Sequence, residues 1–346
     1  MGEALPQRDD FKIEKDKCAM YRFFGDNELP IPKVLGVWSS ADDFLQQLKS
    51  GAAYANASGW PLFLKFCHLT QGFAESTKRL KSEEWLRSHW AEVESFIRDK
   101  WDFEPDDFQR PWRAAANALT DALEKGVMLQ EGAQPSYNPM TGERQMVEFK
   151  VEVLWGRAYL AQLNFDPLVG TKAHEVMGWD SVLFTRTATT NVSYAEGFRH
   201  GSGLVLSTAE PLRGDSWFKF IDEEGHLDGC VWPLAEETAR RIGADEIRID
   251  IFIRQGHPAE CVLNENSISS GSLYGAHALH MAALWAAPYA DKTACVFTSD
   301  TPTHKRVGVP GSCDPNYLRT TQPRYSAKTA QELPTDLSWL PEATSC

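Results

Sequence analysis

One predicted β-hairpin of this sequence carries an arginine and two acids that could act together on a phosphate. Isoleucines alternate with other side chains through residues 246–253, which include Arg248 and Asp250, and a period of two is typical of a half-buried strand. A second short strand follows the turn-like sequence RQGHP and runs to Glu265. Carboxylates are hard oxygen ligands for a divalent cation, and a guanidinium group is a planar donor for phosphate. These residue types indicate a metal–phosphate site, and the alternative is a solvated face with an ordinary cross-strand ion pair.

The length of the turn decides which of these side chains meet. A four-residue turn at 255–258 would place Asp250 opposite Leu263 and Arg248 opposite Glu265. In that register the two acids and the arginine lie on one face of the hairpin, because directly opposed residues of a ladder point the same way.

Helices and strands must position this face. They alternate in the first half of the chain, and hairpins dominate the second half, which favours an α+β fold. The predicted helices are 17–24 (capped by Asp16), 39–51, 82–100, 111–125, 234–242 and 277–287, and the predicted strands are 34–38, 60–67, 127–130 and two within 146–163. The polar stretch EGAQPSYNPMTGERQ, residues 131–145, is the predicted boundary between two lobes.

The charge balance and hydropathy exclude two classes of partner. The 346 residues include 35 Lys and Arg against 48 Asp and Glu, a net charge of −13. A nucleic-acid partner is not expected, because a phosphate backbone requires a basic stripe. No apolar run is long enough to span a membrane, and the first ten residues lack a signal-peptide core, so we expect a cytoplasmic protein without a membrane partner.

The seven cysteines are scattered through the chain without CxxC spacing. An odd and dispersed set of this kind favours reduced thiols over a disulfide framework or a structural zinc site.

Six sequence motifs, taken in order, resemble those of the ATP-grasp superfamily, and most closely those of its TupA-like branch. They are DKCAMYRFFGDNELPIPKVLGVW, FLKFCHLTQG, VMLQEGA, VEFKVEVLWGR, RIDIF and ENSISSG, and together they cover about residues 15–155 and 245–272. The resemblance implies an ATP-grasp-like fold in which two α/β lobes clasp a nucleotide. It implies an N-terminal helix and strand segment (1–60), a small lobe (61–132), a large lobe with the metal and substrate site (133–309) and a polar, Pro-rich tail (310–346).

The resemblance assigns phosphate-binding roles to two lysines. Lys65, in an apolar strand, would hold the α- and β-phosphates, and Lys17 would make a second phosphate or adenine contact. The loop after Lys65 would close over the phosphates. The alternatives are an edge lysine with its amine in water and a solvated helix lysine.

The resemblance also implies residues for the nucleoside. Gln130, Glu131 and Ala133 would form a hinge whose backbone reads adenine, and an ordinary strand end is the alternative. Glu148 would accept hydrogen bonds from the ribose hydroxyls, with Lys150 on the same face. A surface alternation of Glu and Lys is the other interpretation.

The hairpin would then be the magnesium site. Asp250 and Glu265 would be the metal ligands, and Arg248 would neutralise charge that develops during the reaction. Ser267 stands where the superfamily usually has a metal-ligating Asn. Ser267 is the candidate third ligand, and Asn264 or Asn266 could substitute for it.

The implied activity is that of a biosynthetic ligase with ATP and Mg²⁺ as cofactors. A carboxylate would be activated as an acyl phosphate and joined to an amine, with ADP released. The partners would be a small-molecule acid and amine, amino-acid-like or peptide in nature. Two alternatives remain open, a small-molecule kinase on the same scaffold and a non-catalytic carbohydrate- or peptide-binding protein with a decayed nucleotide site. The twelve tryptophans and Ser267 favour the last of these.

Overall fold

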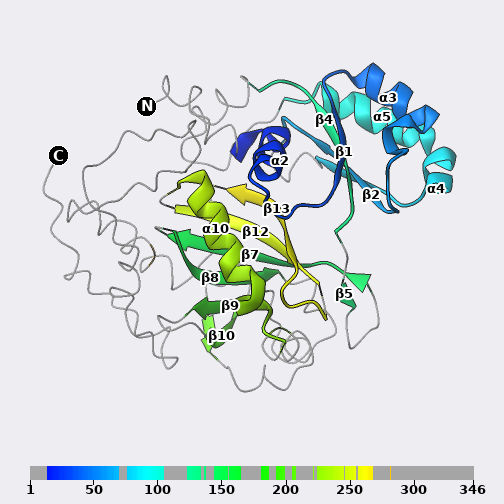
Figure 1. The fold of residues 1–346 in the computed structure, drawn as a ribbon. Coiled ribbons are helices and arrows are strands. Elements are labelled where there is room, and N and C mark those ends of the chain that lie inside the picture. The colour runs from blue at the N-terminus through cyan, green and yellow to red at the C-terminus, as the bar shows by residue number, and fades with distance from the viewer. Residues whose placement is uncertain are drawn as a thin grey trace, which may run out of the picture. The chain divides into compact units, whose positions relative to one another are not determined.

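The chain divides into two compact units, Met1–Ala133 and Gln134–Cys346 (Figure 1). The computed structural model describes residues 14–69, 76–104, 123–133, 136–137, 144–154, 156–164, 181–186, 192–198, 205–207, 221, 224–244, 246–254, 256–267 and 281. Each unit combines helix with an antiparallel sheet, which confirms the predicted α+β class. The predicted helices at 111–125 and 277–287, most of the loop after Lys65 and the tail at 310–346 lie outside the described residues.

The sheet of the first unit has the order β1-β4-β2-β3, and every neighbouring pair is antiparallel. Its strands are β1 (Val34–Trp38), β2 (Leu62–Phe66), β3 (Thr77–Leu80) and β4 (Val127–Glu131). β4 therefore lies between two strands, although it is the last of the four in sequence. Residues 1–60, predicted as a separate segment, supply β1 to this same sheet.

The first helix of the first unit begins at its predicted cap, Asp16. The helices in the described residues of this unit are α2 (Lys17–Asp26), α3 (Ala41–Ser50), the 3-10 turn η2 (Ala52–Tyr54), α4 (Glu83–Ser88) and α5 (Trp90–Trp101). The Asp16 carboxylate accepts from the amides of Cys18 and Ala19 at the start of α2, and Gly51 ends α3 in the left-handed conformation with φ 87°.

The single helix predicted over 82–100 is wrong, because the chain forms two helices with a break at His89. The Ser88 hydroxyl donates to the Trp85 carbonyl at 3.0 Å, and the His89 ring lies 2.9 Å from the same oxygen. Side chains that compete for a helix carbonyl weaken the backbone ladder there. The His89 ring also stacks on Trp85 with 4.5 Å between ring centroids.

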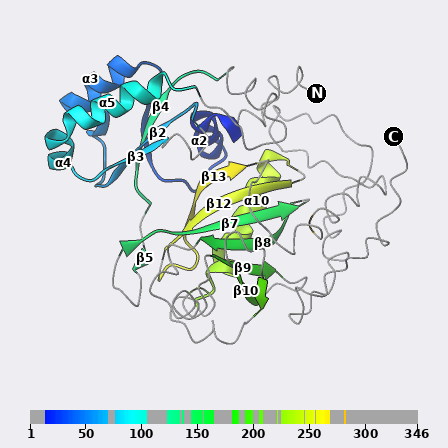
Figure 2. The ribbon, with the colours of Figure 1, turned by 180° about the vertical axis from the view of Figure 1, so that it is seen from behind.

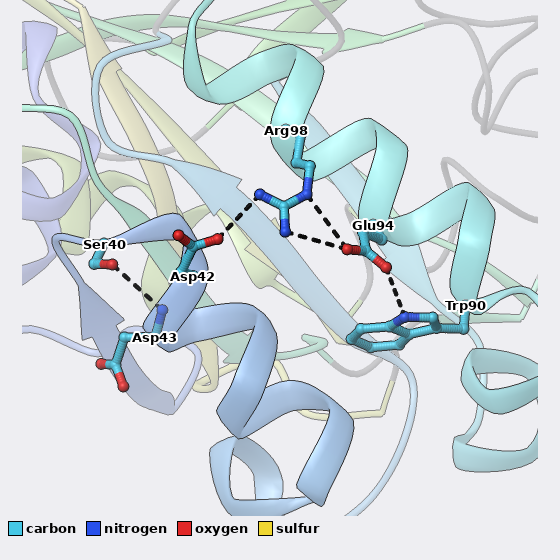
Figure 3. A network of polar contacts seen from close by, with 6 residues as sticks. All are labelled: Ser40, Asp42, Asp43, Trp90, Glu94 and Arg98. Carbon is cyan, nitrogen blue, oxygen red and sulfur yellow. Dashed lines mark hydrogen bonds and ion pairs between the residues drawn. The ribbon is translucent and has the colours of Figure 1, made fainter.

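An arginine on α5 connects this helix to α3 (Figure 3). The Arg98 guanidinium donates to Asp42 on α3 at 3.0 Å and to Glu94 on α5 at 3.2 Å. Glu94 in turn accepts from the indole of Trp90 at 2.9 Å. The ion pairs are exposed, so we expect them to set the orientation of the helices more than the stability of the unit.

The two faces of β2 have different partners. Leu62, Leu64 and Phe66 are fully buried in the core formed with α3, α5 and β4. Lys65 lies on the opposite face, where it contacts Tyr21 of α2. Figure 2 shows α3 and α5 on one side of this sheet and α2 on the other. The alternation of β2 thus directs its lysine away from the core.

The second unit contains one large antiparallel sheet of order β11-β10-β9-β8-β7-β12-β13. Its strands are β7 (Val147–Leu154), β8 (Arg157–Asn164), β9 (Ser181–Arg186), β10 (Val192–Phe198), β11 (Val205–Ser207), β12 (Glu246–Ile253) and β13 (Cys261–Ser267), and the short strands β5 (Ser136–Tyr137) and β6 (Arg144–Gln145) pair separately. The π-helical turn η5 (Leu227–Val231) leads into α10 (Trp232–Ile242), which packs across β12, β7 and β8 (Figure 1).

The predicted register of the β12–β13 hairpin is wrong. Asp250 lies opposite Glu265, whereas Ile251 lies opposite Leu263, so Asn264 is an extra residue in a β-bulge. The connection is also longer than four residues. Two successive turns, closed by hydrogen bonds from His257 to Arg254 and from Glu260 to His257, occupy the segment between the strands.

The expectation of reduced thiols is wrong for four of the seven cysteines. Cys18 is joined to Cys67, and Cys230 is joined to Cys261. Each disulfide lies within one unit, and the first connects α2 to the end of β2. None of the helices in the described ranges is long and apolar enough to cross a membrane.

Candidate functional site

Polar side chains form rows across three neighbouring strands of the second unit. In one row Lys150 of β7 lies opposite Asp250 of β12, which lies opposite Glu265 of β13. In the next row Glu152, Arg248 and Ser267 are opposed in the same strand order. The isoleucines between them point to the other face, under α10, and are 0–1% exposed. Burial of the isoleucines beneath the helix therefore fixes the polar residues on the opposite face.

Arg248 and Asp250 form a bidentate ion pair along β12. The guanidinium Nε donates to Oδ1 of Asp250 at 2.7 Å, and Nη2 donates to Oδ2 at 2.9 Å. Asp250 is only 2% exposed. A paired geometry of this kind fixes both side chains, and each carboxylate oxygen keeps a second lone pair for another ligand.

Glu148 lies one row further along β7, opposite Phe252. The Asn264 side chain donates to its carboxylate with 2.6 Å between Nδ2 and Oε1. The bulge at Asn264 brings this amide to the polar face beside Glu265. Asn266, in contrast, lies opposite Ile249, on the face covered by α10. Of the two asparagines that could substitute for Ser267, only Asn264 is therefore among the acids.

Burial and mutual repulsion raise the pKa values of two acids on this face, Glu148 and Asp250. Burial, followed by the charge of Asp250, raises the pKa of Glu148 to about 7, against the opposing effects of Asn264 and Lys150. Burial also raises the pKa of Asp250, although Arg248 opposes that shift. Burial disfavours the charge of Arg248, but the charge and hydrogen bonds of Asp250 outweigh it and raise the arginine pKa. The proton equilibria of the face are therefore linked.

The composition of the face suits a divalent cation. Four carboxylates, from Glu148, Glu152, Asp250 and Glu265, stand against the two cations Lys150 and Arg248, an excess of two negative charges when all are ionised. Carboxylate, hydroxyl and amide oxygens are the ligands that Mg²⁺ accepts. The only three Asp, Glu, His or Cys ligand atoms within 4.8 Å of one another, among the described residues, belong to Asp16, Cys18 and Cys67.

The two predicted phosphate lysines lie together in the first unit. The Lys65 amine donates to the Tyr21 hydroxyl at 2.9 Å and lies 5.0 Å from the centre of that ring. The Lys17 amine donates to the Ser76 hydroxyl at 3.1 Å. Lys17 and Tyr21 are one turn apart on α2 and share a face, so both amines gather between α2 and the β2–β3 pair. Both lysines are buried, at 5% and 6% exposed.

The predicted hinge residues lie at the end of the first unit, where the backbone of β4 and of the residues after it already makes hydrogen bonds. Gln130 lies opposite both Val34 and Phe63, and the amides of Glu131 and Gly132 donate to the Lys33 and Pro61 carbonyls.

The side chains of the hinge residues differ in their partners. The Glu131 carboxylate accepts from the Ser58 amide and pairs with Lys33, and these contacts outweigh burial and lower its pKa. Gln130 is 3% exposed, and its side-chain oxygen has no hydrogen-bond partner in the described part of the chain. Ala133 follows the strand as the last residue of the unit.

Sequence reasoning missed three residues that contact or flank the predicted ones. Glu152 is fully buried on the polar face, and the alternation of Glu148 and Lys150 could have indicated it. Tyr21 could have been found from its spacing to Lys17 on the helix. Asn264 was considered only as a substitute ligand, because its contact with Glu148 depends on the bulge.

Comparisons with protein-family models and with curated proteins gave no match. Among solved structures, a RimK domain ATP-grasp protein from Sphaerobacter thermophilus is 14% identical with a TM-score of 0.38, over 80% of this chain and 68% of that one. An N5-carboxyaminoimidazole ribonucleotide synthetase from Thermotoga maritima is 12% identical with a TM-score of 0.33, over 75% and 43%. The ATP-grasp ligase PsnB, complexed with Mg and ADP, is 11% identical with a TM-score of 0.35, over 79% and 58%. This chain thus spans less than two thirds of two of them, and similarity at this level carries no weight for what it binds or catalyses.

Proposed function

We propose that this chain is an ATP- and magnesium-dependent ligase of the ATP-grasp type, in the TupA-like branch, which joins a carboxylate to an amine and releases ADP. The observation that supports it is the polar face of β7, β12 and β13, where Asp250 lies directly opposite Glu265 and beside Arg248. The two opposed acids are suitable cation ligands, and the arginine beside them can donate hydrogen bonds to a phosphate.

The proposed magnesium ligands are Asp250 and Glu265, with Ser267 or Asn264 as the third. The excess of carboxylates on this face supports the assignment, because a bound cation would stabilise the ionised acids, whose pKa values are raised by burial and, to a smaller extent, by mutual repulsion. When bound, magnesium neutralises charge on the transferring phosphoryl group.

We propose separate roles for three other side chains of the second unit, Arg248, Glu148 and Lys150. Arg248 is held in one orientation by Asp250, so its guanidinium group can stabilise negative charge that develops on the substrate without first being ordered. Glu148, positioned by Asn264, would accept from the ribose hydroxyls, and Lys150 would hold a phosphate oxygen.

We propose that the lysines of the first unit bind nucleotide phosphates. Lys65 and Lys17 each donate to a hydroxyl, which helps to order the amine. We propose that the backbone of Ala133 makes the adenine contact, since the amides of Glu131 and Gly132 already have partners. The side chain of Gln130 could supply a further acceptor.

The test is a screen for ADP release with magnesium, ATP and pools of amino acids and short peptides as acid and amine. A ligase releases ADP only when both an acid and an amine are present, and forms an amide that mass spectrometry detects. A phosphorylated product without amine would show a kinase instead. Ligand binding without ADP release in any pool would contradict catalysis and favour a binding protein.

A further inference from the structure

We infer that the Cys18–Cys67 disulfide is a positioning element for the lysine pair Lys17 and Lys65, so that phosphate binding by the first unit depends on the oxidation state of this bond. The inference rests on the proposed function in one respect, that the two lysines bind phosphate.

The disulfide joins the two elements that carry these lysines, next to the lysines themselves. Cys18 follows Lys17 at the start of α2, and Cys67 comes two residues after Lys65 at the end of β2. Their Cα atoms are 4.9 Å apart, across 49 residues of sequence. The amide of Lys17 donates to the carbonyl of Cys67 at 2.9 Å, directly beside the crosslink. The covalent bond and this hydrogen bond therefore fix the backbone of Lys17 to the end of the lysine strand.

Cys67 is itself fixed to the sheet. Its amide donates to the Gly126 carbonyl at 2.8 Å, immediately before β4. Gly126 allows this approach because it has no side chain, and a Cβ there would lie 2.7 Å from the sulfur of Cys67. The crosslink thus connects α2 to a backbone that β2 and β4 already hold in place.

The consequence for the lysines follows from the other contacts of α2. Tyr21 holds the Lys65 amine, and Tyr21 lies one turn beyond the crosslinked Cys18 on the same helix. A shift of α2 would therefore move the Lys17 backbone and the hydroxyl that holds Lys65 together. Ordering long side chains at the moment of binding costs free energy, which a crosslinked and preorganised pair avoids.

Reduction is a balanced exchange with a dithiol. The dithiol supplies two electrons and two protons, becomes a cyclic disulfide, and leaves Cys18 and Cys67 as separate thiols. Both cysteines are buried, at 5% and 3% exposed, so we expect slow reduction, which thiol counting by mass spectrometry should follow.

The experiment measures binding of inorganic tripolyphosphate without magnesium, by calorimetry, to oxidised and to dithiol-reduced full-length protein. We expect reduction to weaken binding by about tenfold, the scale of ordering two long side chains. The Cys18→Ser/Cys67→Ser variant should bind as weakly as the reduced protein and should not respond to dithiol. The Cys230→Ser/Cys261→Ser variant, which lacks the disulfide of the second unit, should bind like the wild type and keep its response. Equal affinity of the oxidised and reduced wild type would overturn the inference.

A second readout separates this inference from the proposed function. Hydrogen exchange of residues 17–26 in the nucleotide-free protein should accelerate on reduction in the wild type, and should be fast from the start in Cys18→Ser/Cys67→Ser. Unchanged exchange would overturn the positioning role. Faster exchange in a protein that binds no tripolyphosphate even when oxidised would refute phosphate binding by the lysines, and the proposed function with it, while confirming that the crosslink positions α2.

Discussion

At the scale of single residues, the ion pair of Arg248 and Asp250 is the most constrained feature of the candidate site. Its two hydrogen bonds offset part of the cost of burying both charges. Loss of one partner leaves the other charged and buried, so Asp250 contributes to stability as well as to the proposed chemistry. Glu265 is less buried and is the better residue with which to test the chemistry alone.

We predict that Glu265→Gln lowers turnover by a factor of about one hundred or more with little change in stability, because it removes a charged magnesium ligand. Asp250→Asn should lower turnover similarly and also reduce the free energy of unfolding by about 3 kcal/mol, since Arg248 loses its charged partner. Steady-state ADP release and urea unfolding measure the two effects. Glu260→Gln, in the exposed turn of the same hairpin, is the matched control. Normal turnover in both site variants would reject the metal assignment.

Glu148 should make stability depend on pH. Its pKa is about 7 in the folded protein against an ordinary value of 4.5, so the folded state retains the proton longer. The stability contributed by protonated Glu148 is therefore complete below about pH 4.5 and is lost as the pH rises through about 7. The loss should be on the order of 2–3 kcal/mol in EDTA, and Glu148→Gln should remove it. Urea unfolding between pH 5 and 8 measures the effect. An equal change of the unfolding free energy with pH in wild type and variant would contradict the prediction.

At the scale of elements, strand β2 and helix α2 together position the two lysines of the first unit. β2 directs its leucines into the core and Lys65 toward α2, and α2 presents Lys17 and Tyr21 on one face. Neither lysine would have its position without the other element. In the second unit, the bulge in β13 positions the acids, because it aligns Glu265 with Asp250.

Replacement of Lys65 tests its proposed contact with the nucleotide phosphates. Lys65→Ala should weaken ATP binding by roughly 1.5–3 kcal/mol, the scale of a lost charge-assisted hydrogen bond, and should leave adenosine binding nearly unchanged. Calorimetry with the two ligands measures the difference. Lys81→Ala, just beyond β3, is an exposed control that should bind both normally. Equal losses for ATP and adenosine would mean that Lys65 supports the fold and does not contact phosphate.

At the scale of the whole molecule, the chain divides into two compact units, and each carries residues to which the proposed function assigns a role. The lysines belong to the first unit, and the acids and Arg248 belong to the second. In the part of the chain that the structure describes, each unit also contains one disulfide. Disulfides are uncommon in cytosolic proteins, so the compartment in which the protein resides bears directly on the state of the lysine pair.

ATP with magnesium should therefore raise the melting temperature of the full chain more than either does alone, because ligands that bind only the folded state stabilise it. At a free ligand concentration of one hundred times the dissociation constant, the free energy of unfolding rises by about 2.7 kcal/mol, which calorimetry detects readily. EDTA should remove most of the effect of ATP, and adenosine should give little. An equal rise of the melting temperature with ATP in EDTA and with ATP in magnesium would contradict the proposed cation site.

Local chemistry in the sequence was enough to predict several elements. A capping Asp16 and a terminal Gly51 delimit helices, and alternation identifies β2, β7 and β12. These signals act over a few residues, so they need no knowledge of distant contacts. Arg248, Asp250, Glu148 and Lys65 lie on these alternating strands, and the family resemblance selected them together with Glu265 and Lys17.

Contacts between distant parts of the chain could be decided only by the tertiary structure. The alignment of Asp250 with Glu265 depends on a bulge at Asn264 and on two turns that pack beside η5, where the Gly256 amide donates to Glu224. Pairing of Cys18 with Cys67 depends on how α2 meets β2 across 49 residues of chain. Residue spacing does not encode these long-range contacts, because the packing of whole elements and the strand pairing of each sheet determine them.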